Sequence, residues 1–303
     1  MYFGYIQIQN TTDCVGGVAG YINDSTVSYC ANHGTVTTGA AGGYTGGVVG
    51  YLNNSGGSVK NCYNYGPVAN GGGAHCGAII GWLRGHTAAS LTDNYYLTDS
   101  APAAFGSGSA STSASAPAKE KASFISGEVC YLVNSKTSTG GKALWKQDID
   151  NGNTPYDTYP IFEAAAVYYH SDGLYSNDPE KVSVTITWGD MTFDYHEGRW
   201  DPDTHQYSGG WSPLTTGGND LTVQNNSNVA LAVSFAFQAD AAFTQYDLTG
   251  TFNGVAAGAN RMERGGSLSA QLTLKSLNPG SLKDQGQKKI GQVTVSLTTI
   301  GGE

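Results

Sequence analysis

Charged side chains are scarce in this chain. Only 13% of the 303 residues are Asp, Glu, Lys or Arg, and the formal net charge is -9 at pH 7. Recognition of a phosphate backbone requires a local cluster of Lys or Arg, and the sequence contains none. The composition therefore predicts that nucleic acid is not a partner.

Long apolar runs are also lacking. The most apolar stretch, residues 77–83, is interrupted by glycine and is much shorter than the roughly 20 residues that cross a bilayer as a helix. We expect no membrane insertion. The chain opens directly in repeat-like sequence without the basic and apolar start of a secretory signal, so we expect a trimmed N-terminus.

Glycine and tyrosine are abundant, with 43 and 19 residues. This balance favours strands and tight turns over amphipathic helices and predicts an all-β chain. The length suffices for two domains with separate cores. The five cysteines are an odd number, so at least one thiol stays unpaired within a monomer.

The first hundred residues repeat with a period of about thirty residues. One block occupies residues 16–22, 46–52 and 77–83, and a second block follows each of them at residues 26–34, 58–66 and 90–98. Each block is short, rich in Val, Ile and Tyr, and bounded by Gly or Asn, so one unit cannot bury its apolar face without its neighbours. The pattern predicts a β-solenoid or β-helix-like domain with two strands per repeat.

Cys30 and Cys62 occupy equivalent positions in successive repeats. They would lie on adjacent coils of the predicted solenoid, where a disulfide and an apolar stack of two thiols are both open alternatives.

The Gly-Gly-Val-x-Gly-Tyr blocks resemble the GLUG-motif repeats of bacterial surface proteins, including regions attached to immunoglobulin A peptidases. The resemblance covers residues 14–98. It implies display outside the cell, on the bacterial surface or as a secreted protein. The repeats mark no single biochemical activity.

We expect a first domain over residues 1–178 and a second over residues 179–303. The first contains an Ala/Ser/Pro-rich stretch at residues 99–121, predicted as an exposed loop or linker. Residues 122–178 are predicted to cap the last coil of the solenoid, with a short helix over 128–134.

The second domain shows apolar alternation, which predicts an immunoglobulin-like β-sandwich of about seven strands. The strands are expected at residues 182–188, 191–196, 221–223, 231–237, 268–274 and 293–297. Residues 188–193 and 225–228 also resemble a module common in surface proteins of Gram-positive gut bacteria.

None of the strong catalytic or nucleotide-binding motifs is present. Between residues 14 and 98 the only charged side chains are Asp24, Lys60, Arg84 and Asp93, whereas carbohydrate-cleaving β-helices need clustered charges or calcium. We predict no catalytic residue, no cofactor and no metal site. Residues 148–157 are the best calcium-loop candidate, and a turn stabilised by Asp and Asn side chains explains them equally well.

Three aromatic residues, Trp200, Tyr207 and Trp211, lie in a turn-rich stretch of the second domain. They are the candidate ligand-binding residues, because exposed rings stack on sugars or anchor protein partners. The alternative is that they cover one end of the sandwich.

The sequence thus predicts a non-enzymatic adhesin or stalk fragment. Its expected partner is a host glycan or a host protein such as a mucosal glycoprotein or an immunoglobulin. The alternative function is an accessory region of a larger secreted peptidase or glycosidase.

Overall fold

Strands dominate the computed structural model, and helices are few, which confirms the predicted all-β class. The structure describes residues 6–8, 14–39, 43–53, 56–84, 90–108, 116–139, 143–149, 157–203, 205–207, 209–276 and 286–300. The chain divides into two compact units, residues 1–169 with 175–179 and residues 170–174 with 180–303.

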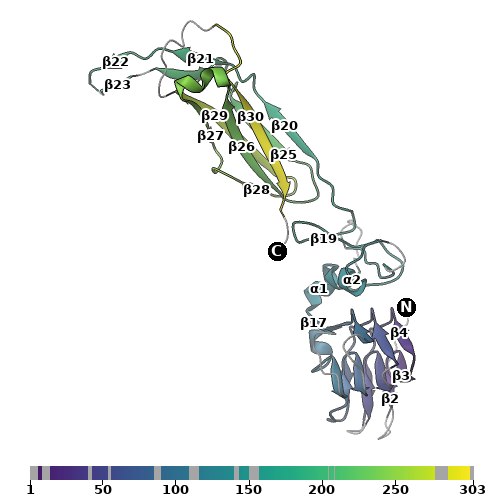
Figure 1. The fold of residues 1–303 in the computed structure, drawn as a ribbon. Coiled ribbons are helices and arrows are strands. Elements are labelled where there is room, and N and C mark those ends of the chain that lie inside the picture. The colour runs from purple at the N-terminus through teal and green to yellow at the C-terminus, as the bar shows by residue number, and fades with distance from the viewer. Residues whose placement is uncertain are drawn as a thin grey trace. The chain divides into compact units, whose positions relative to one another are not determined.

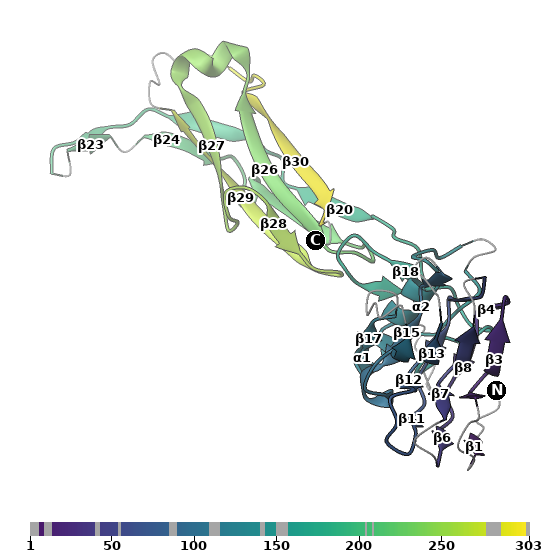
Figure 2. The same cartoon turned by 60° about the horizontal axis from the view of Figure 1, so that its bottom comes forward.

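The first unit is built from short parallel strands that pair with strands one repeat away. Its strands are β1 (Ile6–Ile8), β2 (Cys14–Gly16), β3 (Ala19–Asn23), β4 (Thr26–Ser28), β5 (Ala31–Asn32), β6 (Val36–Thr38), β7 (Tyr44–Gly46), β8 (Val49–Asn53), β9 (Ser58–Lys60), β10 (Tyr63–Asn64), β11 (Val68–Ala69), β12 (Cys76–Gly77), β13 (Ile80–Leu83), β14 (Leu91–Thr92), β15 (Tyr95–Leu97), β16 (Phe105–Gly108) and β17 (Ala118–Lys119). They form five narrow sheets, ordered β1-β6-β11, β17-β15-β10-β5, β12-β7-β2, β16-β13-β8-β3 and β14-β9-β4 (Figures 1 and 2).

The repeats stack in register. In the sheet that contains β8, Ile22 pairs with Leu52, which pairs with Leu83. The side chains of all three are at most 6% exposed and belong to one apolar cluster. A single repeat is too small to bury such side chains, so the stacking itself makes the core.

Buried asparagines run up the interior beside this apolar core. The Asn32 side-chain amide donates to the Asn64 Oδ1 at 2.8 Å, and the Asn64 amide donates to the Ser100 Oγ at 3.1 Å. Each amide also donates to a carbonyl of its own turn, at Gly34 and Gly66 respectively. A buried polar group is costly unless it is hydrogen-bonded, and here each repeat supplies the partner for the next.

Two short helices follow the repeats, α1 (Lys121–Ile125) and α2 (Glu128–Val133), so the helix predicted over 128–134 is confirmed. Phe124 and Trp145 are at most 2% exposed and pack against Tyr63 and Tyr95. These tyrosines belong to β10 and β15, so this segment packs on sheet β17-β15-β10-β5 along several repeats, whereas the prediction placed it over the last coil.

The Ala/Ser/Pro-rich stretch is not simply an exposed loop. Within residues 99–121, β16 pairs with β13 and β17 pairs with β15. Ala101, Ala104 and Ala116 are at most 9% exposed and lie in the apolar cluster of the repeats. The prediction of an exposed loop or linker is therefore wrong for these described residues, because the interior here accepts small side chains.

The second unit contains two antiparallel sheets. The larger has the order β20-β25-β29-β27 and the smaller the order β28-β26-β30 (Figures 1 and 2). The bounds are β20 (Val184–Trp188), β25 (Asp220–Asn225), β26 (Leu231–Ala239), β27 (Leu248–Asn253), β28 (Asn260–Met262), β29 (Ser267–Ser276) and β30 (Gly291–Thr299). Five of these strands, β20, β25, β26, β29 and β30, were predicted with slightly different ends, and the sixth predicted strand, residues 191–196, corresponds to β21 (Phe193–His196). β27 and β28 were not predicted.

The two sheets of the second unit pack on each other through apolar side chains. One cluster joins Leu221 and Leu272 of the larger sheet to Phe235 of the smaller, and a second joins Val223 to Leu231. A 3-10 helix, η4 (Ala241–Tyr246), connects β26 to β27.

Among the described residues, six shorter strands form three further pairs. They are β18 (Tyr168–Tyr169), β19 (Tyr175–Ser176), β21 (Phe193–His196), β22 (Trp200–Asp201), β23 (Gln206–Tyr207) and β24 (Gly210–Pro213). The pairs are β18 with β19, β21 with β24, and β22 with β23, all antiparallel.

Candidate binding surfaces

Aromatic side chains form a column on one outer face of the repeats. Tyr21 of β3 pairs with Tyr51 of β8, which pairs with Trp82 of β13. Each of them precedes an inward-pointing Ile or Leu, so alternation along the strand places the ring outside. Tyr44 and His75 stand beside this row. We call Tyr21, Tyr44, Tyr51, His75 and Trp82 the aromatic ladder.

The rings of the aromatic ladder contact one another closely. Tyr44 and Tyr51 both stack on Trp82, with centroid distances of 4.6 and 4.8 Å. His75 lies 4.9 Å from Tyr44. Tyr21 meets Tyr51 edge-on at 5.1 Å, with an interplanar angle of 77°. These arrangements suit the ring quadrupole and hold each ring in place.

Exposure differs along the ladder and is highest at Tyr21. The Tyr51 side chain is only 8% exposed, whereas Tyr21 is 53% exposed. The rings of Tyr44 and Trp82 are part-buried. The buried Tyr51 ring therefore supports Tyr21 from one side, and Tyr21 presents an aromatic surface to solvent.

Amide groups lie next to the exposed ring. The Asn53 amide donates to the Tyr21 hydroxyl oxygen at 2.9 Å and to the Asn23 Oδ1 at 3.1 Å. The Tyr51 hydroxyl donates to the Asn53 Oδ1 at 2.8 Å. The surface thus combines an aromatic ring with neutral donors and acceptors.

The structure describes the side chains of two of the three aromatic residues singled out in the sequence, Trp200 and Trp211. The Trp200 side chain is 50% exposed, and its ring meets His205 at 6.1 Å. Trp211 is part-buried, donates its indole N–H to the Ser276 Oγ at 3.0 Å and packs on Tyr195. The backbone of Tyr207 pairs with Trp200, and its side chain lies outside the described part. Trp211 is therefore held by packing and a hydrogen bond, whereas Trp200 presents a half-exposed ring on β22.

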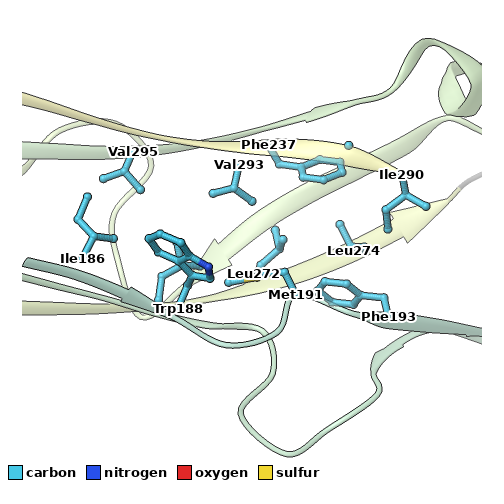
Figure 3. Close-up of a pocket in the computed structure, with 12 residues that line it drawn as sticks. Ile186, Trp188, Met191, Phe193, Phe237, Leu272, Leu274, Ile290, Val293 and Val295 are labelled. Carbon is cyan, nitrogen blue, oxygen red and sulfur yellow. The ribbon is translucent and has the colours of Figure 1, made fainter. Parts of the chain in front are cut away.

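A second candidate surface is an apolar cleft between the two sheets of the second unit. Its volume is about 420 Å³. Figure 3 shows Ile186, Trp188, Met191 and Phe193 along one wall, Phe237, Ile290, Val293 and Val295 along the other, and Leu272 and Leu274 between them. We call this the open cleft. Trp188 at its mouth is 66% exposed.

A cluster of buried titratable side chains lies where the segment after the helices covers the repeats. The His33 Nε2 lies 2.7 Å from the Tyr63 hydroxyl, and the His33 ring lies 3.8 Å from the Tyr159 ring. Burial lowers the pKa of His33 to about 4 and raises the pKa of Tyr63 well above its ordinary value. Both side chains are therefore neutral near pH 7 and serve packing.

The five cysteines, all of which lie in the described ranges, are free thiols. Cys30 and Cys62 are neighbours, with the Cys30 backbone N–H donating to the Cys62 Sγ at 3.4 Å. A hydrogen bond from the Cys62 thiol lowers the pKa of Cys30 to about 7, and it raises the pKa of Cys62. The sequence left open a disulfide or a stack of two thiols, and the structure shows two adjacent free thiols.

No group of three or more His, Cys, Asp or Glu side chains in the described part of the chain is arranged to hold a metal ion. Most of the calcium-loop candidate, residues 150–156, lies outside the described residues. Nor does any helix among the described segments have the length and apolar character needed to span a bilayer.

The aromatic ladder was missed at the level of sequence, although the signal was present. Tyr21, Tyr51 and Trp82 recur at the same place in the repeated block, and a residue that stays aromatic in every copy forms a column when the copies stack in register.

Comparison of the chain with protein-family models, with curated proteins and with solved structures finds no match.

Proposed function

We propose that this chain is a non-enzymatic extracellular protein of a bacterium that binds neutral glycans on its aromatic ladder. The observation that carries the proposal is the half-exposed Tyr21 ring, which contacts the Tyr51 ring edge-on and is flanked by the Asn23 and Asn53 amides. The C–H groups of a sugar carry partial positive charge and pack on the negative face of an aromatic ring.

The fold that we propose supports this role. Parallel in-register pairing of strands one repeat apart supports a β-solenoid for the first unit. The strand order β20-β25-β29-β27 opposite β28-β26-β30 supports an immunoglobulin-like sandwich for the second. When β28 is set aside, the larger sheet has the ABED order of that fold, and β26 pairs with β30 as C pairs with F. Many cell-surface domains share the sandwich architecture, and stacked repeats form extended binding surfaces.

The scarcity of charged side chains in the repeats favours a neutral glycan over an acidic one. The four charged side chains between residues 14 and 98 include only two cations, Lys60 and Arg84. A sialylated or sulfated ligand needs paired cations, preferably arginines, for affinity. We therefore narrow the expected partner to uncharged sugars of a host glycan or glycoprotein.

The proposal is tested by screening the intact chain on an array of neutral, sialylated and sulfated glycans. We expect hits among the neutral glycans. Tyr21→Ala should weaken them at least about tenfold, and Tyr21→Phe, which keeps the ring, should retain most of the binding.

The matched control is Trp200→Ala, which removes a ring of similar exposure from the second unit. It should leave the glycan hits unchanged. Loss of binding in Trp200→Ala with retention in Tyr21→Ala would move the site to the second unit, and an array without neutral hits would contradict the proposal.

A further inference from the structure

We propose that the open cleft of the second unit is a docking site for an extended peptide strand, donated by a partner polypeptide and added to the free edge of β30. This inference concerns a different unit and a different ligand from the glycan proposal, and the two stand independently.

The cleft lies between two unpaired strand edges. Among the described residues, β20 pairs only with β25, and β30 pairs only with β26. Both strands contribute to the lining of the cleft. A strand edge presents a row of backbone N–H and C=O groups that pair readily with another extended chain.

The interior of the cleft is apolar. Its lining is aliphatic and aromatic apart from the indole N–H of Trp188 and one glycine. Water finds too few hydrogen-bond partners in such a space. A small apolar molecule would fill the cleft but would leave the strand edges unpaired. A peptide strand would both fill the cleft and pair with the edge of β30, because every second side chain enters the cleft while the backbone bonds to β30.

The alternation along β30 points to the same occupant. Val293, Val295 and Leu297 face the interior and are only part-buried, although Leu272 and Leu274 at the floor are at most 4% exposed. The inner face of the unit is therefore less well covered at this edge than at its centre. One more strand beside β30 would bury these side chains.

Natural sheets usually protect such an edge with charged side chains, proline or a bulge. β30 has none of them: its outward side chains are Gln292, Thr294, Ser296 and Thr298, and it pairs with β26 without interruption over nine residues. An unprotected regular edge of this length is suited to pairing.

A second copy of the same unit is a poor occupant. The larger sheet has four strands and ends on β20, which forms the opposite wall of the cleft. If two copies paired through their β30 strands, each copy would bring a three-stranded sheet, β28-β26-β30, to the edge of a cleft of only about 420 Å³. A single strand that is not embedded in a sheet of its own enters without this conflict.

Charge at one end of the cleft defines the chemistry of the partner further. Lys288 and Lys289 are exposed and directly precede Ile290, which lines the cleft. An antiparallel strand, the more stable pairing, would end beside Ile290. We therefore expect a segment with apolar side chains at alternate positions and acidic residues at its C-terminal end.

The probe is a short synthetic peptide in which valine and threonine alternate and the last two residues are aspartate. Binding to the intact chain is measured by calorimetry and by the fluorescence of Trp188, which should shift to the blue as the exposed indole is covered. Trp188→Phe identifies the part of the signal that comes from this site.

Val293→Asp places an unpaired carboxylate in the cleft and should weaken peptide binding at least about tenfold. Trp188→Glu, at an exposed position, tests the opposite wall without touching the core. Thr251→Asp adds the same charge on β27, at the other edge of the larger sheet, and should leave binding unchanged. Circular dichroism verifies that each variant is folded.

Two control peptides test the chemistry. A peptide with the same composition but with its valines grouped together should bind at least about tenfold more weakly, because alternation is lost. Replacing the two aspartates with lysines should also weaken binding.

Equal binding of the grouped peptide, or no binding of the alternating one, would overturn the proposal. A concentration-dependent dimer of the free chain that Val293→Asp abolishes would assign the edge to a second copy and would likewise overturn it.

Discussion

At the scale of single residues, the first unit surrounds several titratable groups closely enough to change their chemistry. His33 lies between the rings of Tyr63 and Tyr159, and Cys30 lies against Cys62. Neither position follows from composition, because both depend on which residues meet when chain segments far apart in sequence pack together. Each leads to a prediction with a defined sign.

The pKa of His33 predicts a loss of stability in mild acid. Burial lowers this pKa from 6.5 to about 4, so between these values the unfolded chain binds a proton that the folded chain does not. The contribution of the neutral His33 ring to the free energy of unfolding is fully present above pH 6.5 and is lost as the pH falls toward 4. Scanning calorimetry should show the unfolding temperature falling from pH 6.5 to 5.

The control for this prediction is His33→Gln, which removes the titrating ring. The fall in unfolding temperature over the same pH range should become shallower. An unchanged slope would show that His33 is accessible to protons in the folded state.

The Cys30 thiol should react at a lower pH than an ordinary cysteine. The Cys62 thiol donates a hydrogen bond that stabilises the Cys30 thiolate, and the pKa of Cys30 falls from 9.0 to about 7. Because the thiolate is the nucleophile, alkylation of Cys30 by iodoacetamide should reach half its maximal rate near pH 7. Peptide mass spectrometry after timed quenching gives the rate.

Cys62→Ala should move the Cys30 profile toward pH 9. Cys130, whose pKa is raised by burial, should stay unmodified in the folded chain. Reaction of Cys30 only above pH 8 in the parent chain would contradict the predicted hydrogen bond.

At the scale of elements, the close stacking of the repeats limits which residues fit. A Cβ at Gly47 would lie 2.1 Å from the Ala78 carbonyl oxygen and 2.4 Å from the Asn64 side chain. One repeat earlier, a Cβ at Gly17 would likewise crowd the Gly47 carbonyl oxygen and the Asn32 side chain. These glycines let the strands of neighbouring repeats approach each other, and the buried asparagines fill the space beside them.

Gly47→Ala should therefore destabilise the chain by about 2 kcal/mol, in the range measured for overpacked interiors. Denaturant titration measures the change. Gly210→Ala is the control, because no atom lies within 4 Å of its added Cβ, and its effect should stay within about 0.5 kcal/mol. Equal effects at the two positions would show that the repeats are less closely stacked than described.

How much of these elements the sequence predicts depends on the kind of signal. The strands β26 and β30 follow from strict alternation, which the structure retains. β27 was missed because Gly250 interrupts its apolar side, and the structure explains the glycine: a Cβ there would lie 2.6 Å from the Phe237 ring. A residue selected for a contact across the sheets carries no local pattern.

The binding surfaces were harder to predict than the strands. Trp200 and Trp211 were grouped because they are close in sequence, yet one is half-exposed and the other hydrogen-bonded to Ser276. The residues of the aromatic ladder come from three repeats and meet only through stacking. The open cleft depends on the relative extent of two sheets, which no single strand specifies.

At the scale of the whole molecule, the two units offer surfaces of different chemistry. The aromatic ladder contains no Asp, Glu, Lys or Arg, whereas Lys288 and Lys289 directly precede Ile290 of the open cleft. Screening by salt affects only interactions between charges. Raising the ionic strength from about 0.1 M to about 1 M should leave glycan affinity within about twofold and weaken binding of the acidic peptide. Parallel calorimetric titrations at both salt concentrations test this difference, and a glycan affinity that falls with salt would indicate a charged site.

The two proposals together assign sugar binding to the repeats and attachment to another polypeptide to the second unit. The contribution of each surface is separable, since Tyr21→Ala alters only the first and Val293→Asp only the second.

The measurement that tests the central claim most directly is the NMR spectrum of the tyrosine rings of the intact chain, recorded while neutral oligosaccharides are added. The account predicts that the resonances of Tyr21 and Tyr44 shift and saturate, while that of Tyr246 in the second unit stays in place. Shifts confined to the second unit, or no shift of Tyr21 with any neutral sugar, would contradict it.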